Sequence, residues 1–407
     1  MSPETVRWLD KNAGQAICFI LTMHRRLFGA FGKGLDAAGA CRRMLFIKLT
    51  EQGSTILAWR AFKKAADIVG RDNLFILVFD ENRPILDVLD VVPSSNIIAV
   101  ASSGPFSFFR SLVKAISRIR REKIDVCVDM EFFSRASAIL SYAAGAVRRV
   151  GLHAFHDEGP YRGDLFTHKL IYDPHIHTEV FFSSLVEALG HSPARADAPL
   201  IFRAPQREGR LPEFSPTHEE RKSVAGKIKG SAGQGCGKPL VILNPNIGDI
   251  IPIRKWPEEN FIKLGNMIRG KFKEAAIIIT GTAKEKGRAS FVASSIPGAV
   301  SLAGETSLRE LLALFCIADL LVTNDSGPAH FAALTPLKTI VLFGPETPAL
   351  YSPAGGNSEI IYAGLVCSPC INVYNYKKSP CDNAVCLKNI TSEDIFDKVK
   401  KILKKPI

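Results

Sequence analysis

The chain has 407 residues, which is too long for one ordinary hydrophobic core, and about 150 residues per domain is a usual size. Its hydrophobic fraction of 46% and charged fraction of 23% are typical of globular proteins and exclude a low-complexity chain. The net charge of +12 favours anionic partners, but the basic residues are scattered and no nucleic-acid-binding motif is present. We therefore expect no nucleic acid partner. An odd number of cysteines, nine, argues against an extracellular disulfide framework.

Residues 1–40 contain an uncharged stretch, "NAGQAICFILTM", that is too short to span a membrane. Acidic residues precede it and Arg25 and Arg26 follow it, an order that is wrong for a signal peptide. On a helix its large apolar side chains, with those just after it, form one stripe: Ile17, Ile20, Leu21, Leu27, Phe28 and Phe31. Two interpretations remain open, a helix lying in a membrane interface and a helix packed on the protein's own surface.

From residue 44 onward, short apolar strands alternate with amphipathic helices. The predicted strands cover residues 44–49, 73–79, 96–100 and 124–130, and the predicted helices cover 54–70, 81–92, 106–122 and 134–146. This alternation predicts parallel βαβ units with helices on both faces of a sheet. It breaks between residues 152 and 237, where Pro, Gly and charged residues are frequent.

The alternation then restarts. Strands are predicted at 240–245, 275–280, 319–324 and 338–344, and helices at 257–272, 283–296, 307–318, 328–334 and 392–405. We therefore predict α/β domains over residues 41–205 and 237–390, a linker over 206–236 and a C-terminal helix within 391–407. Ligands of such sheets bind outside the carboxyl ends of the strands, so the loops that follow the strands are the candidate site.

A polar cluster, "TNDSGPAH", follows the strand at 319–324. Gly327 allows close approach of the backbone, the helix start and Ser326 offer an anion site, and Asp325 can accept from a hydroxyl or an amine. His330 falls one turn into the helix. The alternative is a capped helix with a buried, satisfied histidine.

Two further loops of the second domain add polar groups. Arg254 and Lys255 precede the helix at 257–272 and are suited to neutralising a phosphate, although they are also consistent with solvated surface charge. Gly281 again allows close approach, and Glu285 is suited to a ribose diol or simply to the first turn of a helix.

These stretches resemble glycosyltransferase family 9, the ADP-heptose:lipopolysaccharide heptosyltransferases and their relatives. The matching segments are "MLFIKLTEQGSTILAWRAF", "RKWP", "ITGTAKEKGRA", "LAGETSLRELLALFCIADLLVTNDSGPAHFAAL" and "TIVLFGPETPALYSP". The resemblance covers about residue 42 to the C-terminus, and its most specific part is the Asp-Ser/Thr-Gly-Pro-x-His signature. It implies the GT-B fold, in which two doubly wound, Rossmann-like domains face each other, with the acceptor site in the first and the nucleotide-sugar site in the second.

The resemblance also implies residue roles. Arg254 stands where the family usually has a phosphate-binding lysine, and Glu285 stands where it binds the ribose. The expected donor-binding residues are Asn244, Arg254, Lys255, Gly281, Glu285, Thr306, Asp325, Ser326, Gly327 and His330. The implied donor is an ADP-sugar, with no cofactor and no metal, and the implied mechanism is inversion by direct displacement.

One position departs from the family. Heptosyltransferases carry a proposed catalytic aspartate directly after the glycine of the loop "TEQGST", where this chain has Ser54. A serine hydroxyl is a poor base at neutral pH, so Glu51 of the same loop is the best local substitute. The alternative is that Glu51 is an exposed loop carboxylate. On the acceptor side we expect Gly53, Asp129, Glu131, His156 and Arg162, with Asp129 and Glu131 as further candidates for the base.

Four late cysteines, Cys367, Cys370, Cys381 and Cys386, have a spacing that suits either a structural zinc site or a local fold element. The resemblance to family 9 implies a glycosyltransferase that acts on a lipid-linked, lipopolysaccharide-type saccharide, and we expect it to be cytoplasmic and peripheral to the inner membrane. Because Ser54 replaces the expected aspartate, a non-catalytic saccharide-binding or complex-forming relative remains an alternative. A sugar-nucleotide epimerase is a second alternative.

Overall fold

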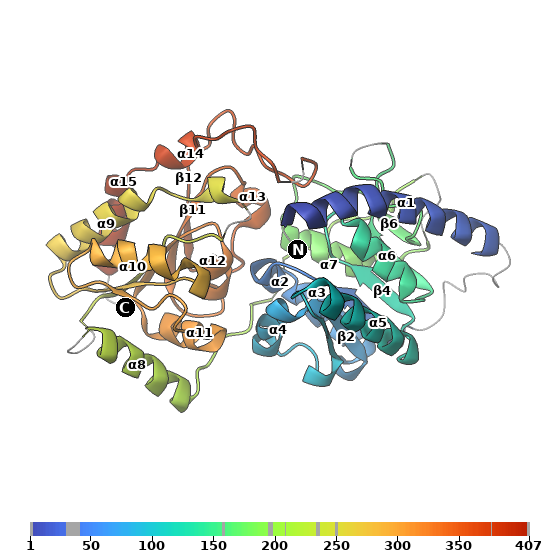
Figure 1. Ribbon diagram of the computed structural model, residues 1–407, viewed down its shortest axis with the longest axis horizontal. Helices are drawn as coiled ribbons and strands as arrows, with labels where there is room; N and C mark the ends of the chain where they lie inside the picture. The colour runs from blue at the N-terminus through green and yellow to red at the C-terminus, as the bar shows by residue number, and fades with distance from the viewer. Residues whose placement is uncertain are drawn as a thin grey trace. The chain divides into compact units, whose positions relative to one another are not determined.

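Short runs of Val, Ile, Leu, Phe and Met form the central strands of two parallel sheets, and these strands are buried on both faces. The computed structural model describes residues 3–29, 41–156, 159–193, 198–207, 209–232, 237–248, 251–375 and 377–404. The chain divides into two compact units, Met1–Gly209 and Arg210–Ile407. Within the described ranges, each unit contains one six-stranded sheet (Figure 1).

The first unit contains the following strands and helices: α1 (Pro3–Gly29), β1 (Met44–Ile47), α2 (Gln52–Leu57), α3 (Trp59–Val69), β2 (Leu74–Phe79), α4 (Arg83–Leu89), β3 (Ile97–Val100), α5 (Pro105–Arg121), β4 (Val126–Asp129), α6 (Arg135–Ala143), β5 (Arg148–Leu152), β6 (His168–Leu170) and α7 (Thr178–Glu187).

The second unit contains these elements: α8 (His218–Ala232), β7 (Leu240–Asn244), η5 (Pro252–Arg254), α9 (Glu258–Lys271), β8 (Ala276–Ile279), η6 (Ala283–Glu285), α10 (Lys286–Ser294), β9 (Val300–Ser301), α11 (Leu308–Ile317), β10 (Leu320–Asn324), α12 (Gly327–Ala332), β11 (Lys338–Phe343), α13 (Pro348–Tyr351), β12 (Ser358–Tyr362), α14 (Val385–Lys388) and α15 (Ser392–Leu403).

The two sheets have the same topology. Their strand orders are β3-β2-β1-β4-β5-β6 and β12-β11-β10-β7-β8-β9, and the strand pairs that the structure describes are parallel. The chain order therefore reverses between β1 and β4 in the first sheet and between β7 and β10 in the second. In sheets of this kind the crevice at the carboxyl ends of such a strand pair is the usual ligand site.

Side chains of β1 alternate between the two helical layers of the first unit, as strand geometry requires. Phe46 contacts Phe62 of α3, with ring centroids 5.0 Å apart. Leu45 and Ile47 point the other way, into a core that also contains Ala115 of α5 and residues of and just after α6. Helices α5 and α6 therefore cover the same face of this sheet.

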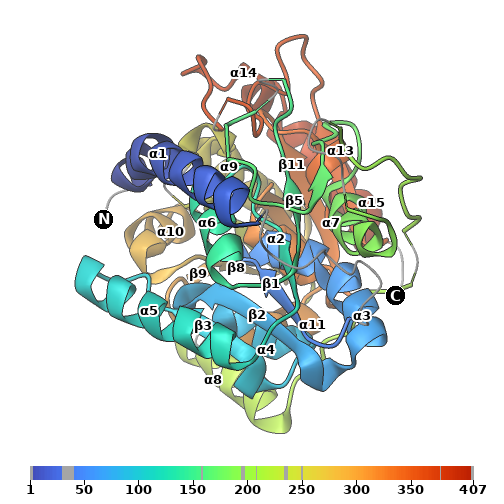
Figure 2. The same ribbon diagram turned by 90° about the vertical axis from the view of Figure 1, so that its right-hand side faces the viewer.

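Helix α1 lies beside α6 (Figure 2), and its fully buried residues in this contact are small. Gly14, Cys18 and Thr22 face the protein and are buried, whereas Ile17, Phe19, Ile20 and Leu27 are exposed. Leu21 is half-buried against the core, and the side chains of Phe28 and Phe31 lie outside the described residues. Most of the described part of the predicted stripe thus faces solvent. No helix among the described residues is long and apolar enough to cross a membrane.

Polar contacts also hold α1 in place. The carboxylate of Asp10 accepts from the backbone N–H of Ala136 at 2.9 Å, and Arg25 lies 2.7 Å from a carboxylate oxygen of Asp164. Gly163 has a φ of +68°, and a Cβ there would lie 2.5 Å from Thr22 Oγ1 and 2.7 Å from the carbonyl oxygen of Cys18. The structure therefore places α1 within the first compact unit.

The doubly wound α/β prediction is confirmed in both halves. The pattern does not predict β6, β9 or β12, which are short strands at or near sheet edges. The irregular stretch after residue 152 contains β6, α7 and α8, so less of it is linker than its composition indicates. The boundary between the two units falls after Gly209, within the stretch predicted as linker.

We predict that Gly163→Ala lowers the free energy of unfolding of the first unit by about 3 kcal/mol. A left-handed backbone costs a residue with a side chain about 1–2 kcal/mol, and the added methyl group overlaps α1. Gly104→Ala is the matched control, because its φ is +71° and the nearest atom lies 3.7 Å from the new Cβ. Urea denaturation followed by circular dichroism measures both variants. Equal losses would show that the contact with α1 adds nothing.

Candidate functional site

Asn324, at the end of β10, joins three segments of the second unit. Its side chain is buried; Oδ1 accepts from the backbone N–H of Trp256 at 2.9 Å, and Nδ2 donates to the carbonyl of Pro245 at 3.0 Å. The Trp256 ring is also buried, and its N–H donates to the carbonyl of Ile390. The "RKWP" segment is thereby fixed against the carboxyl ends of β7 and β10.

The neighbouring turn brings together two of the predicted donor residues. Arg254 lies on η5, and its Nη2 is 2.8 Å from a carboxylate oxygen of the buried Asp325. The same nitrogen donates to the backbone carbonyl of Asp325. The pair places a guanidinium at the switch point of the sheet and gives the buried carboxylate of Asp325 a counter-charge.

Ser326, Gly327 and His330 follow in the same turn. The hydroxyl of Ser326 donates to the carbonyl of Asn324 at 3.2 Å, and His330 is buried one turn later. Helix α12 has six residues, so its start provides a shorter helix dipole than the sequence pattern indicates.

Lys255 lies beside an acidic side chain, which its predicted role in binding a phosphate does not take into account. Its Nζ lies 3.1 Å from a carboxylate oxygen of Glu258, which Arg288 also contacts at 2.6 Å. Lys255 therefore offsets the negative charge of Glu258 in the first turn of α9, and it also adds positive charge to the loop before that helix. Whether it also contacts a ligand stays a prediction.

The loop after β8 is tied to the loop after β7. One carboxylate oxygen of Glu285 accepts from Thr282, and the other accepts from the backbone N–H of Gly248 at 3.0 Å. A Cβ on Gly281 would lie 2.5 Å from Nδ2 of Asn246, so a larger residue there would have to displace that amide. The loop after β9, which carries the half-buried Thr306, is joined to it by the Gly304 N–H, which donates to Gly281 O at 2.9 Å.

Two buried amides lie beneath these loops. Asn244 and Asn246 both donate through Nδ2 to Thr280, yet among the described residues neither Oδ1 atom has a hydrogen-bond partner. Buried acceptors are normally paired, which makes these two candidates for ligand contacts. Asn244 is a predicted donor residue. Asn246 is not, although it stands two residues later in the same "NPN" segment.

In the first unit, Glu51 directly precedes α2 and is exposed. Its φ is +65°, a left-handed conformation that costs a residue with a side chain about 1–3 kcal/mol and is concentrated at functional sites. Gly53 is buried in α2, and Ser54 is half-buried beside it. The Glu51 side chain is therefore more exposed to solvent than the Ser54 side chain.

Glu131 holds this loop in place. Its Oε1 accepts from the backbone N–H of Leu49 at 2.6 Å and of Thr50 at 3.2 Å, and the buried Lys48 lies 3.5 Å away. The Glu131 carboxylate therefore joins the end of β4 to the loop after β1 through these hydrogen bonds. This geometry argues against Glu131 as the base and gives it a positioning role.

Asp129 and Arg162 form a fully buried ion pair. Arg162 also donates to the carbonyls of Ser134 and Leu152, and Ser137 donates to Asp129 at 2.9 Å. Burial raises the pKa of Asp129, and Arg162 opposes that shift. Because neither side chain reaches solvent, our expectation that they contact an acceptor directly is corrected: they support the loop between β4 and α6.

The stretch after β5 presents fewer groups than its sequence indicates. His156, which we expect on the acceptor side, is exposed. His168 is buried in β6, where burial lowers its pKa to about 4, so it is neutral at pH 7.

The four late cysteines do not form a metal centre in the described part of the chain. Cys367 and Cys381 are exposed, Cys386 is buried, and no three His, Cys, Asp or Glu residues described there lie close enough together to hold a metal ion. The backbone N–H of Cys370 donates to Pro345 O at 3.0 Å, which packs this segment on the end of β11. Both interpretations of these cysteines, a structural zinc site and a local fold element, stay predictions.

Comparison with known proteins identifies relatives of the chain. Residues 112–379 match the family model of glycosyltransferase family 9 (heptosyltransferase). Lipooligosaccharide heptosyltransferase 2 of Campylobacter jejuni is 31% identical over 105 residues, which are 26% of this chain and 32% of that protein. The protein of the same name from Haemophilus influenzae is 30% identical over 129 residues, 30% of this chain and 36% of that one. The chain thus aligns with about a third of these relatives' length.

Solved structures resemble nearly the whole fold. The E. coli ADP-heptose LPS heptosyltransferase II has a TM-score of 0.66 at 18% identity and covers 89% of this chain and 98% of its own. A family 9 glycosyl transferase from Veillonella parvula has a TM-score of 0.67 at 18% identity, over 90% of this chain and 99% of its own. These similarities confirm the predicted GT-B fold.

We predict that Arg254→Ala lowers the free energy of unfolding of the second unit by about 2–3 kcal/mol, because it removes a counter-charge that lies 2.8 Å from the buried carboxylate of Asp325. The double variant Arg254→Ala/Asp325→Ala should lose less than the sum of the single variants, with a coupling of about 1–3 kcal/mol. Thermal or urea unfolding measures the cycle. The exposed pair Lys63–Asp67 is the control, with an expected coupling below about 0.5 kcal/mol. Additive losses at Arg254 and Asp325 would contradict the pairing.

Proposed function

The chain belongs to glycosyltransferase family 9, and we propose that it transfers a sugar from a nucleotide diphosphate sugar to a lipid-linked, lipopolysaccharide-type saccharide. The observation that carries this proposal is the convergence of Arg254, Asp325 and Gly281 on adjoining loops at the switch point of the second sheet. A sheet of this topology binds ligands at that place.

The donor side has the groups that a nucleotide diphosphate sugar requires. The guanidinium of Arg254 suits phosphate oxygens, and Gly281 lets the loop after β8 pack closely against Asn246 of the loop after β7. The buried Oδ1 atoms of Asn244 and Asn246 suit hydroxyl or amine donors of the ligand. We take the donor to be an ADP-sugar, as named for the E. coli relative, and the reaction to need no cofactor.

The proposed chemistry is a direct displacement with inversion at the anomeric carbon. The acceptor hydroxyl oxygen forms the new bond to that carbon, while the bond from the carbon to the diphosphate oxygen breaks. The nucleoside diphosphate leaves with the electron pair, and positive charge from Arg254 stabilises it. The proton of the acceptor hydroxyl passes to a base, and Glu51 is the exposed carboxylate of the loop where relatives carry their proposed base.

We further propose that α1 lies on the cytoplasmic surface of the inner membrane and so brings the protein to its lipid-linked acceptor. The packing of α1 supports this, because its small residues face the protein while Phe19, Ile20 and Leu27 are exposed. A helix whose apolar stripe packed on the protein's own surface would bury those residues instead. Arg26 at the end of the helix is suited to anionic lipid headgroups.

A non-catalytic saccharide-binding relative is the second candidate, and Ser54 is the observation that favours it. A protein of that kind would bind nucleotide sugars without turnover. Screening a panel of nucleotide sugars by calorimetry, with product formation measured in parallel on lipid-linked acceptors, separates the two candidates. Binding without turnover for every donor and acceptor would support the non-catalytic one.

We predict that Glu51→Gln reduces turnover by about 10²–10⁴-fold, because it keeps the shape of the side chain and removes its basicity. Donor affinity, measured by titration with ADP, should change little, because the proposed donor residues lie in the other unit. Ser54→Ala should cost much less turnover. Near-parental turnover of Glu51→Gln would exclude Glu51 as the base.

We predict that Phe19→Ser/Ile20→Ser weakens binding to anionic vesicles at least about tenfold, because two large apolar side chains no longer enter the interface. Substitution is preferable to removing α1, because removal would also break the contacts of Asp10 and Arg25 with the first unit. Flotation with vesicles measures binding, and circular dichroism confirms folding. Unchanged binding would rule out α1 as the attachment.

A further inference from the structure

Helix α5 has apolar residues on both of its sides. Ala115 and Ile119 are buried in the core of the first unit, as expected for a helix that covers a sheet. On the opposite side Phe106, Phe109 and Val113 are 79%, 63% and 66% exposed. A surface helix normally places polar residues there, and grouped exposed apolar side chains mark an interaction surface.

The rest of the exposed side of α5 is basic. The segment Pro105–Arg121 contains no acidic residue and five basic ones: Arg110, Lys114, Arg118, Arg120 and Arg121. Arg110 and Lys114 stand beside the exposed apolar residues, and no described carboxylate forms an ion pair with either of them. Phenylalanine flanked by unpaired cations is the composition of a helix that lies in an anionic lipid interface.

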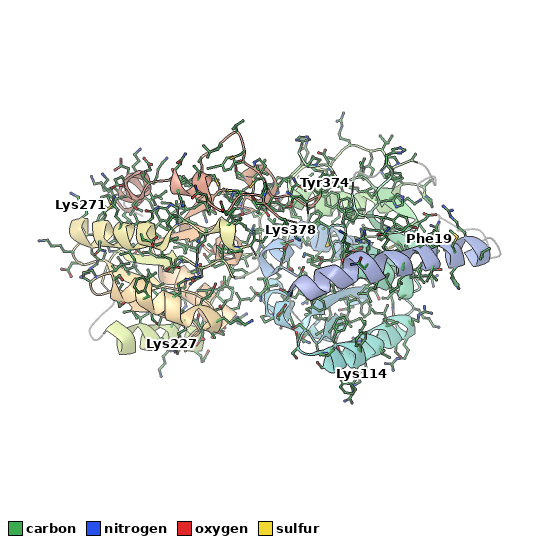
Figure 3. The ribbon with its side chains drawn as sticks, turned by 45° about the horizontal axis from the view of Figure 1, so that its top comes forward. Phe19, Lys114, Lys227, Lys271, Tyr374 and Lys378 are labelled. Atoms are coloured by element: carbon green, nitrogen blue, oxygen red, sulfur yellow. The ribbon has the colours of Figure 1, made fainter. Side chains whose placement is uncertain are left out.

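Helices α1 and α5 lie on the same side of the first unit. Helices α5 and α6 cover one face of the sheet, and α1 packs on α6. Figure 2 shows α1 and α5 along the same side of this unit, and Figure 3 labels Phe19 on α1 and Lys114 on α5. Both helices that carry exposed apolar residues therefore lie on this side of the first unit.

We infer that α5 is a second membrane-contacting helix, which binds an anionic bilayer through Phe106, Phe109 and Val113 together with Arg110 and Lys114. This inference rests on the proposed attachment through α1 and adds its orientation. One interfacial helix leaves the protein free to rotate about the helix axis, whereas two helices on one face fix which side meets the bilayer.

A lipid surface fits α5 better than a second copy of the chain. In a two-fold symmetric contact the same patch meets itself, which would oppose Arg110 and Lys114 to their own copies with no acidic residue on the helix between them. An anionic bilayer supplies the opposite charge and also accepts the phenylalanine side chains.

The test uses the full chain with vesicles of phosphatidylcholine and phosphatidylglycerol in a 3:1 ratio, and with vesicles of phosphatidylcholine alone. Phe106→Ser/Phe109→Ser should bind the mixed vesicles at least about tenfold more weakly than the parent. Arg110→Gln/Lys114→Gln should lose roughly tenfold of the preference for the mixed vesicles. Phe291→Ser is the matched control, because Phe291 is also exposed but lies on α10 of the second unit, and it should bind like the parent.

Insertion can be observed directly with Phe109→Trp. Its added fluorescence, relative to the parent, should be quenched by vesicles containing brominated lipid, whereas that of Phe291→Trp should not. Parental binding of both α5 double variants, with binding lost in Phe19→Ser/Ile20→Ser, would overturn the inference and leave the proposed attachment intact. Absence of parental binding to either vesicle would overturn both. A parental dimer that the α5 substitutions dissociate would show a protein interface instead.

Discussion

A loop that leaves a parallel strand carries backbone groups that no neighbouring strand can pair, and buried groups of this kind must find partners. In both units the partner comes from the strand across the switch point. Asn324, at the end of β10, bonds the loop after β7, and Glu131, just after β4, bonds the loop after β1. Each candidate site is built on a loop fixed in this way, so its geometry depends on one side chain that does not itself belong to the loop.

The two fixed loops differ in charge, and the difference suits different chemistry. The loops of the second unit contain the guanidinium of Arg254, paired with Asp325, and the buried amides of Asn244 and Asn246. These groups suit an anionic ligand with many hydroxyls. The loop of the first unit holds a carboxylate outward in a strained conformation, while the charges behind it are paired and buried. Strain at Glu51 persists because Glu131 and the first turn of α2 determine the loop conformation around it.

Elements built from long periodic patterns could be predicted from the sequence, and so could the loops at the switch points, because both depend on local spacing. The short strands β6 and β9 lack enough residues to show a pattern, and His168 could not be recognised as a strand residue for that reason. The burial of Asp129 behind Arg162 depends on a contact between residues 33 positions apart, which spacing does not reveal. The roles of Lys255 and Glu131 likewise depend on their partners, Glu258 and the amides of Leu49 and Thr50.

The hydrogen bond from Ala136 to Asp10 has a geometric consequence. It joins α1 to the first turn of α6, the loop before α6 carries Glu131, and Glu131 holds the loop of Glu51. Few contacts, all within one compact unit, separate α1 from that carboxylate. In the proposed attachment through α1, these contacts would set the distance between Glu51 and the lipid headgroups. The protein would then select its acceptor sugar by that sugar's distance from the lipid, and sugars nearer to or farther from the bilayer would not reach Glu51.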